Sequence, residues 1–165
     1  MSESADSTEA SEEKGADVRF PPPFVPLILL AVGIAIDKTL APIGWVPEGL
    51  WRWGLGGVLV ADGVLLLGLA NGLFRKTGQD PKPWKPAPEL IIDGIYNYTR
   101  NPMYLGMGSL QAGLGFLFAS VTPAILVPIT WWIIYRIAIR HEEAYLVERF
   151  GEPYEAYMRQ TRRWL

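Results

Sequence analysis

Four long apolar stretches, separated by short polar segments, dominate this chain. They cover residues 24–40, 54–74, 103–119 and 124–139. Stretches of this length with few charges are typical of transmembrane helices, and the last two, at about 17 residues each, are at the short end for a span. Asp37 and Lys38 interrupt the far end of the first stretch, so its full crossing stays open. The pattern predicts an all-α integral membrane protein with about four transmembrane helices.

The second stretch contains two features that bear on helix packing. Small residues would let another helix approach closely, and they stand at Gly56, Gly63, Gly68 and Gly72. Asp62 lies near the middle of the same stretch, where an unpaired charge is costly and a partner is needed. Gln111 lies at a similar depth in the third stretch. We therefore expect a hydrogen bond between Asp62 and Gln111.

The polar ends of the chain predict its domain organisation. Residues 1–19 are rich in Ser, Glu, Asp and Ala and have no apolar period, which predicts a disordered acidic tail. Residues 20–165 then form the membrane domain. The formal net charge of −2 reflects the acidic tail, because the remainder of the chain is basic.

The distribution of lysine and arginine predicts the orientation in the membrane. Residues 75–100 carry five of them and the C-terminal segment carries six, whereas the opposite face has only Lys38 and Arg52. Basic residues gather on the cytoplasmic side of membrane proteins. Both termini and the polar segment before the third stretch are therefore expected in the cytoplasm.

Composition excludes several kinds of site. The chain has no cysteine, which rules out disulfides, thiolate metal ligands and a cysteine nucleophile. It has a single histidine, His141, which argues against a multi-histidine metal centre. The basic residues flank apolar stretches and form no stripe on a soluble domain, so we expect no metal and no nucleic-acid partner. The pattern carries no signal for an oligomeric state.

The polar segment at residues 93–106 is where we expect chemistry. Its Asn101-Pro102 step biases the preceding backbone away from a helix and suits a helix start, with Asn101 as the cap and Pro102 in the first turn. The positive end of that helix would lie beside Arg100 and Tyr96. This segment should therefore form an anion-receptive corner with aromatic walls.

A hairpin of the last two stretches should bring two polar clusters together. The turn at residues 120–123 joins these stretches, so the segment before the third and the extension after the fourth lie on the same face. The clusters comprise Tyr96, Arg100, Asn101 and Tyr104 on one side, and Arg136, Arg140, Glu142 and Glu143 on the other. Along a helix Glu142 points about 100° away from Glu143, so the two carboxylates do not hold the same atom.

These residues resemble the integral membrane methyltransferases that include isoprenylcysteine carboxyl methyltransferase and phosphatidylethanolamine N-methyltransferase. The family pattern has Gly-x-Tyr, then Arg-His-Pro-x-Tyr-x-Gly, and later Glu-Glu and Phe-Gly-x-x-Tyr-x-x-Tyr. The corresponding residues here are 94–96, 100–106, 142–143 and 150–157. The resemblance covers roughly residues 88–165. Asn101 departs from it, because it stands where many relatives have a histidine, and asparagine does not titrate near neutral pH.

The resemblance implies S-adenosylmethionine as cofactor, in a cytoplasmic pocket formed by the loop before the third helix and the extension of the fourth. The implied cofactor-binding residues are Leu90, Ile91, Tyr96, Arg100, Asn101, Pro102, Met103, Tyr104, Gly106, Glu142 and Glu143. Glu142, with Glu143 as a second candidate, would hold the amino group of the cofactor. Arg136 matches an arginine that orients the acceptor, so Arg136 and Glu142 are the implied catalytic residues.

The implied activity is methyl transfer from S-adenosylmethionine to a lipophilic acceptor that enters from the bilayer. An isoprenylcysteine-type carboxylate and a phospholipid amine are rival acceptors, and no residue decides between them. The alternative is a membrane scaffold or small carrier that keeps the fold without catalysis. Simpler interpretations also stand for single residues: a Glu-Glu pair is usually a solvated helix face, and Arg136 and Arg140 would serve equally as membrane anchors.

Overall fold

The computed structural model describes residues 15–40 and 49–165, and each regular element in these ranges is helical. In chain order they are α2 (Phe24–Thr39), a π-helical turn (Leu50–Leu55) that continues as α3 (Gly56–Lys76), a 3₁₀ turn (Gly94–Asn97), α4 (Pro102–Leu117), α5 (Thr122–Ile125), α6 (Val127–Ile134), a π-helical segment (Tyr135–Ile139), α7 (Arg140–Phe150) and α8 (Glu152–Gln160). The all-helical prediction is therefore confirmed for the described residues.

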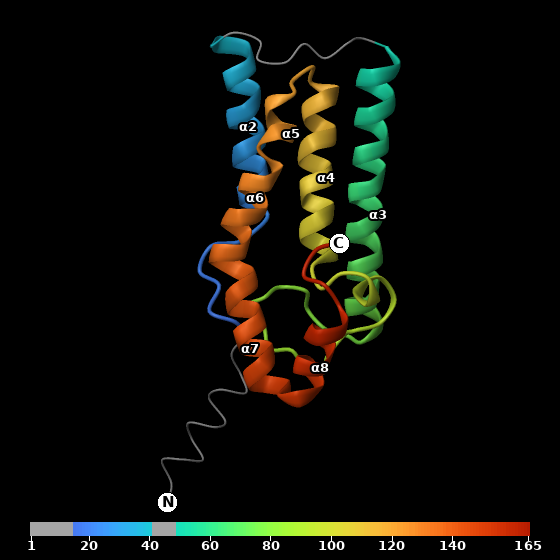
Figure 1. Ribbon diagram of the computed structural model, residues 1–165, viewed down its shortest axis with the longest axis vertical. Coiled ribbons are helices and arrows are strands. Elements are labelled where there is room, and N and C mark those ends of the chain that lie inside the picture. The colour runs from blue at the N-terminus through green and yellow to red at the C-terminus, as the bar shows by residue number, and fades with distance from the viewer. Residues whose placement is uncertain (1–14, 41–48) are drawn as a thin grey trace, which may run out of the picture.

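The long helices lie side by side along the long axis of the molecule, with α4 between α3 and the α5–α6 pair (Figure 1). Each predicted apolar stretch folds as helix. Among the described helices, the continuous segment Leu50–Lys76 is long and apolar enough to cross a membrane, and only 11% of its most apolar window is buried within the protein. The number of crossings and the side on which the termini lie stay predictions.

Glycines set the close packing of α3 on α4. A Cβ atom added to Gly63 would lie 2.7 Å from the carbonyl oxygen of Gly106, and one on Gly113 would lie 2.9 Å from that of Gly56. The two backbones therefore touch where side chains are missing, as in close membrane helix pairs. Gly68, by contrast, has nothing within 4 Å of its added Cβ and takes no part in this contact.

Asp37 explains how α2 tolerates a charge near its end. Its carboxylate is buried and accepts hydrogen bonds from the hydroxyls of Ser120 and Thr122, and from the backbone amide of Thr122 at 3.0 Å. These donors belong to the turn after α4 and to the first residue of α5. Asp37 therefore fastens the first helix to the hairpin.

The expected pair of Asp62 and Gln111 is wrong. The hydroxyl of Ser109 donates to Asp62 at 2.7 Å, whereas the amide of Gln111 donates to the carbonyl of Pro123 at 2.8 Å and its oxygen accepts from Thr130 at 2.6 Å. The reason is helical geometry: residues 109 and 111 point in directions about 200° apart, so only Ser109 faces α3. Gln111 is buried against α5 and α6 instead.

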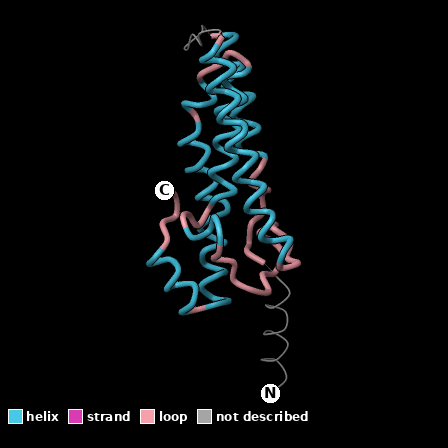
Figure 2. Tube along the Cα trace, turned by 90° about the vertical axis from the view of Figure 1, so that its right-hand side faces the viewer, coloured by secondary structure: helices cyan, strands magenta, loops and turns pink. Residues whose placement is uncertain are grey.

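The chain after α6 turns back on itself. The π-helical segment and α7 extend the fourth helix, and Gly151, with φ of 59°, ends it before α8. Figure 2 shows α7, α8 and the long loops gathered at one end of the bundle, away from the α4–α5 turn. The final residues pack on the protein rather than extend away from it, because Trp164 stacks on Trp131 with ring centroids 5.4 Å apart.

The start of the described chain also packs at this end. Most of the predicted acidic tail, residues 1–14, lies outside the described residues. Within the remainder of that tail, Ala16 and Val18 are buried, and the amide of Ala16 donates to the carbonyl of Pro83 at 2.8 Å. Ala16 and Val18 therefore pack on the protein at the end of the stretch that the sequence predicts as the tail.

Candidate active site

A cavity of about 310 Å³ lies where the loops meet α4 and α7. Its walls come from several parts of the chain that are far apart in sequence: the residues before α2, the end of α3 and the loop after it, the first turns of α4, the first turns of α7, and α8. Among the residues that the sequence predicts, those that line it are Leu90, Ile91, Tyr96, Arg100, Asn101, Pro102, Met103, Tyr104 and Glu142. The hairpin therefore brings the two predicted clusters to one cavity.

Glu142 is the acidic group of this cavity that comes from α7. It accepts a hydrogen bond from the hydroxyl of Tyr104, and in the described part of the chain no lysine or arginine forms an ion pair with it. The pKa of Glu142 is raised to about 7, chiefly by burial and in smaller part by the charge of Glu143, although the hydrogen bond from Tyr104 lowers it. Burial disfavours the charged form of this carboxylate, and a cation bound beside it would favour that form.

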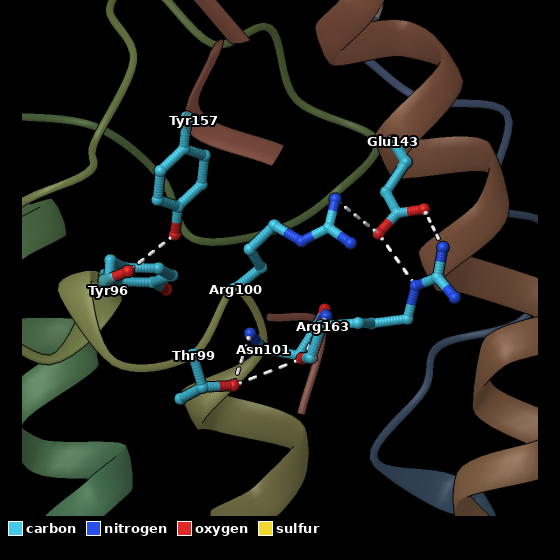
Figure 3. Close-up of polar contacts among 7 residues, drawn as sticks. All are labelled: Tyr96, Thr99, Arg100, Asn101, Glu143, Tyr157 and Arg163. Carbon is cyan, nitrogen blue, oxygen red and sulfur yellow. Dashed lines mark hydrogen bonds and ion pairs between the residues drawn. The ribbon is translucent and has the colours of Figure 1, made fainter. Parts of the chain in front are cut away.

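Glu143 is not among the residues that line the cavity, and it lies between two arginines (Figure 3). Arg163 donates to it through two nitrogens at 2.9 and 2.8 Å, and Arg100 approaches it at 3.3 Å. This contact with Glu143 raises the pKa of Arg163. The paired glutamates therefore divide as helical geometry predicts, with Glu142 at the cavity and Glu143 in an ion-pair network behind it.

Asn101 precedes the first residue of α4, as predicted, but its side chain does not cap the helix. Its amide nitrogen instead donates to the carbonyl of Arg163 at 3.0 Å, and the hydroxyl of Thr99 donates to the same oxygen at 3.1 Å (Figure 3). The amide of Arg100 donates to the carbonyl of Arg162 at 2.9 Å. The C-terminal residues thus hold the predicted corner in place, which explains why Asn101 is turned away from the helix end.

Two further predicted residues lie outside the cavity. Arg136 is exposed, and its guanidinium lies 5.7 Å from the centre of the Trp132 ring. Gly106 is buried against α3, where an added Cβ would lie 2.9 Å from the carbonyl oxygen of Gly63. Arg136 therefore does not line the cavity. Gly106 instead allows α4 to pack closely against α3.

The comparison with known families covers more than half of the chain, including the cavity residues from the loop after α3, from α4 and from α7. A family model described as phospholipid methyltransferase matches residues 51–153. The chain belongs to this family. The resemblance drawn from the motifs is thereby confirmed, and the matched region includes both Tyr104 and Glu142.

Several relatives of this phospholipid methyltransferase family member carry the name protein-S-isoprenylcysteine O-methyltransferase. The one from Schizosaccharomyces pombe is 37% identical over 72 residues, which are 44% of this chain and 30% of the relative. The one from Mus musculus is 25% identical over 132 residues, 76% of this chain and 46% of the relative. The one from Saccharomyces cerevisiae is 31% identical over 68 residues, 41% of this chain and 28% of the relative. The chain therefore spans less than half the length of each of these methyltransferases.

Sequence reasoning missed two walls of the cavity in this family member. The proline-rich loop contributes Pro81, Pro83 and Trp84, and α8 contributes Tyr154 and Tyr157. Both tyrosines belong to the C-terminal motif at residues 150–157, but they were not among the predicted site residues.

The two missed walls are held by specific hydrogen bonds. The hydroxyl of Tyr157 donates to the carbonyl of Tyr96 at 2.7 Å, and the amide of Ala87 donates to the hydroxyl of Tyr145 at 3.0 Å. The i, i+3 spacing of Tyr154 and Tyr157, next to a glycine that turns the chain back, was the available signal.

Proposed function

We propose that this chain is an S-adenosylmethionine-dependent methyltransferase that acts on a lipophilic acceptor resident in the membrane. Membership of the phospholipid methyltransferase family supports the reaction class. The observation that carries the proposal is Glu142, a carboxylate with no basic partner among the described residues, facing a cavity beside Tyr104. Such a group is suited to the ammonium of an amino-acid ligand.

The cavity fits this cofactor in size and chemistry. About 310 Å³ falls within the range of small-molecule sites, which are mostly apolar with a few placed polar groups. Tyr96, Met103 and Tyr104 offer aromatic and thioether surface to a purine ring. Bound here, S-adenosylmethionine would supply an electrophilic methyl group on a positively charged sulfur.

The residues of this chain would bind, orient and keep out water. Ionised Glu142 would hold the ammonium, and the Tyr104 hydroxyl would fix the orientation of that carboxylate. Leu90, Ile91 and Pro102 would cover the ligand with apolar surface. Alignment of the two reactants in a cavity shielded from water is what methyl transfer needs from a protein. Arg100 would contribute positive charge to the wall, while Glu143 holds its guanidinium in position.

Support for a membrane-resident acceptor comes from the surface of the protein. The helical segment Leu50–Lys76 is apolar and largely exposed, which favours contact with lipid. The relatives named for isoprenylcysteine support a carboxylate acceptor, and the description of the family supports a phospholipid amine. Arg136 lies outside the cavity, so a role in orienting the acceptor would place the anionic group of that acceptor at the protein surface. A cytoplasmic location of the cavity and both termini completes the proposal.

Transfer of a labelled methyl group tests this function. Protein in detergent micelles is incubated with methyl-labelled S-adenosylmethionine and either membrane phospholipids or a farnesylated cysteine with a free carboxylate. We expect label in a base-labile ester or in a base-stable headgroup amine, with at least a hundredfold loss in Glu142→Gln and little change in the exposed variant Glu152→Gln. If no label is transferred and the protein does not bind S-adenosylhomocysteine, the result would favour the non-catalytic scaffold instead.

A further inference from the structure

The last residues of the chain, after α8, support the wall of the candidate active site without lining its cavity. The carbonyl of Arg162 accepts a hydrogen bond from the amide of Arg100 at 2.9 Å. The carbonyl of Arg163 accepts from the hydroxyl of Thr99 at 3.1 Å and from the side-chain amide of Asn101 at 3.0 Å. This C-terminal segment therefore fixes the backbone that carries Arg100.

Side chains attach the same segment to the helix that continues as α7. Trp164 stacks on Trp131 with ring centroids 5.4 Å apart, and the guanidinium of Arg163 lies 4.9 Å from the centre of the Tyr135 ring. The C-terminal segment thus contacts the fourth helix through its side chains and the start of α4 through its carbonyls. The position of Arg163 is therefore set by contacts on both sides of the site.

Glu143 is shared unequally between two arginines (Figure 3). Arg163 donates to both of its oxygens, at 2.9 and 2.8 Å, which is the bidentate geometry of strong arginine–carboxylate pairs. The nearest nitrogen of Arg100, Nη1, approaches one of these oxygens at 3.3 Å and completes no hydrogen bond there. Arg163 thus occupies the carboxylate that would otherwise pair fully with Arg100.

Arg100 is a buried cation with unused donors. Its side chain is 10% exposed and lines the cavity, and within the described part of the chain its Nε and Nη1 atoms have no hydrogen-bond acceptor. Buried donors without an acceptor are costly, so an acceptor is expected from a ligand. Glu142 lines the same cavity. A guanidinium and a carboxylate at one cavity are complementary to the two charges of an α-amino acid.

We propose that Arg163 is a positioning residue: by occupying both oxygens of Glu143, it keeps Arg100 available to the carboxylate of an amino-acid ligand in the cavity. The inference rests on the proposed function, because S-adenosylmethionine carries such an amino-acid group. Without the Arg163 guanidinium, Glu143 would take Arg100 into a bidentate pair of its own. The Arg100 donors would then be withdrawn from the ligand.

Calorimetric titration of the full chain in detergent micelles with two probes tests this proposal. S-adenosylhomocysteine carries the carboxylate, and its decarboxylated analogue lacks it. We expect wild type to bind S-adenosylhomocysteine about tenfold more tightly than the analogue, since hydrogen bonds to charged groups are strong. Arg163→Gln should lose this preference while binding the analogue like wild type. Arg163→Lys keeps the charge but not the paired hydrogen bonds, and should retain part of the preference.

The matched control is Arg159→Gln. Arg159 is an arginine of α8 whose side chain is 61% exposed, and its partners Glu152 and Glu155 also lie at the surface. Exposed ion pairs of this kind contribute little. This variant should therefore keep the wild-type preference for S-adenosylhomocysteine.

Two further variants show whether Arg163 acts through Glu143. In Arg163→Gln/Glu143→Gln no carboxylate draws Arg100 away, so this double variant should bind S-adenosylhomocysteine no more weakly than Glu143→Gln alone. Thermal unfolding measures the same competition without any ligand. Arg100→Gln should lower the unfolding temperature by about 3 °C more in the Arg163→Gln background than in wild type, because Glu143 then pairs fully with Arg100.

Two results of the titration would overturn the proposal. Arg163→Gln could keep the preference for S-adenosylhomocysteine, or it could lose affinity for both probes equally, which would make the role of Arg163 purely structural. If wild type binds neither probe, the proposed function fails, and the unfolding comparison still decides whether Arg163 competes with Arg100 for Glu143. An equal effect of Arg100→Gln in both backgrounds would contradict that competition.

Discussion

Replacing Glu142 with glutamine should stabilise the protein at alkaline pH. Burial raises the pKa of this carboxyl from its ordinary 4.5 to about 7. Because the folded state binds the proton more tightly than the unfolded state, the resulting stability is fully present below pH 4.5 and is lost as the pH rises to 7. At 1.36 kcal/mol for each pKa unit, the loss above pH 7 is about 3 kcal/mol.

Glutamine stays neutral as the pH rises, so it places no charge in the buried site, and its side-chain oxygen can still accept the hydrogen bond from Tyr104. For a chain of this length, about 3 kcal/mol corresponds to a rise in unfolding temperature of about 6–12 °C. The assay is thermal unfolding of Glu142→Gln and wild type in detergent micelles at pH 5 and pH 8, with Glu152→Gln as the exposed control. We expect Glu142→Gln to raise the unfolding temperature above that of wild type at pH 8, and to raise it much less at pH 5. A variant less stable than wild type at pH 8, or a gain that is independent of pH, would refute the reasoning.

Three further predictions concern the scaffold and the network behind the cavity. Asp37→Ala removes the acceptor of three hydrogen bonds and should destabilise the protein by about 3 kcal/mol, measured by thermal unfolding; an unchanged unfolding temperature would contradict its role. Gly63→Ala should destabilise by about 1–3 kcal/mol because its Cβ meets the backbone of α4, whereas Gly68→Ala should stabilise by about 0.5–1 kcal/mol; the reverse order would show that α3 and α4 do not pack in this way. Glu143→Gln should weaken binding of S-adenosylhomocysteine several-fold by releasing Arg100, with calorimetric titration as the test and wild-type affinity as the contrary result.

The helices and the core of the candidate site follow from local pattern. Apolar runs located the four helical stretches, and the Asn101-Pro102 step located the start of α4 at the residue where it begins. The short hairpin required that Tyr104 and Glu142 lie near one another, and they share a hydrogen bond. These predictions succeed because each depends on helical geometry over a few turns.

Other features depend on contacts between distant segments, which periodicity does not encode. The partner of Asp62 was set by the rotation of α4 about its axis, which placed Ser109 rather than Gln111 toward α3. The return of α8 brought Tyr154 and Tyr157 to the cavity and Arg163 to Glu143. The turn at Gly151 sends α8 back toward the cavity, and the sequence before Gly151 does not predict the direction of that turn.

The position of Arg136 illustrates the same limit on the functional side. Helical spacing places Arg136 on the same side of the helix as Glu143, yet Glu142, the nearest cavity residue on that helix, lies more than one turn further along, and the Arg136 guanidinium lies over the Trp132 ring outside the cavity. The motif match therefore identified Arg136 in the sequence but did not predict that its side chain lies outside the cavity.

The affinity for S-adenosylhomocysteine tests most directly whether Glu142 holds a cofactor in this cavity. Calorimetric titrations at pH 8 and pH 6 would compare wild type, Glu142→Gln and Glu152→Gln. We predict that wild type and Glu152→Gln bind at pH 8 and weaken at pH 6, where Glu142 takes up a proton, since its pKa is raised to about 7 by burial. Glu142→Gln should bind weakly at both. If Glu142→Gln binds as tightly as wild type with the same dependence on pH, the carboxylate does not hold the ligand and the account is contradicted.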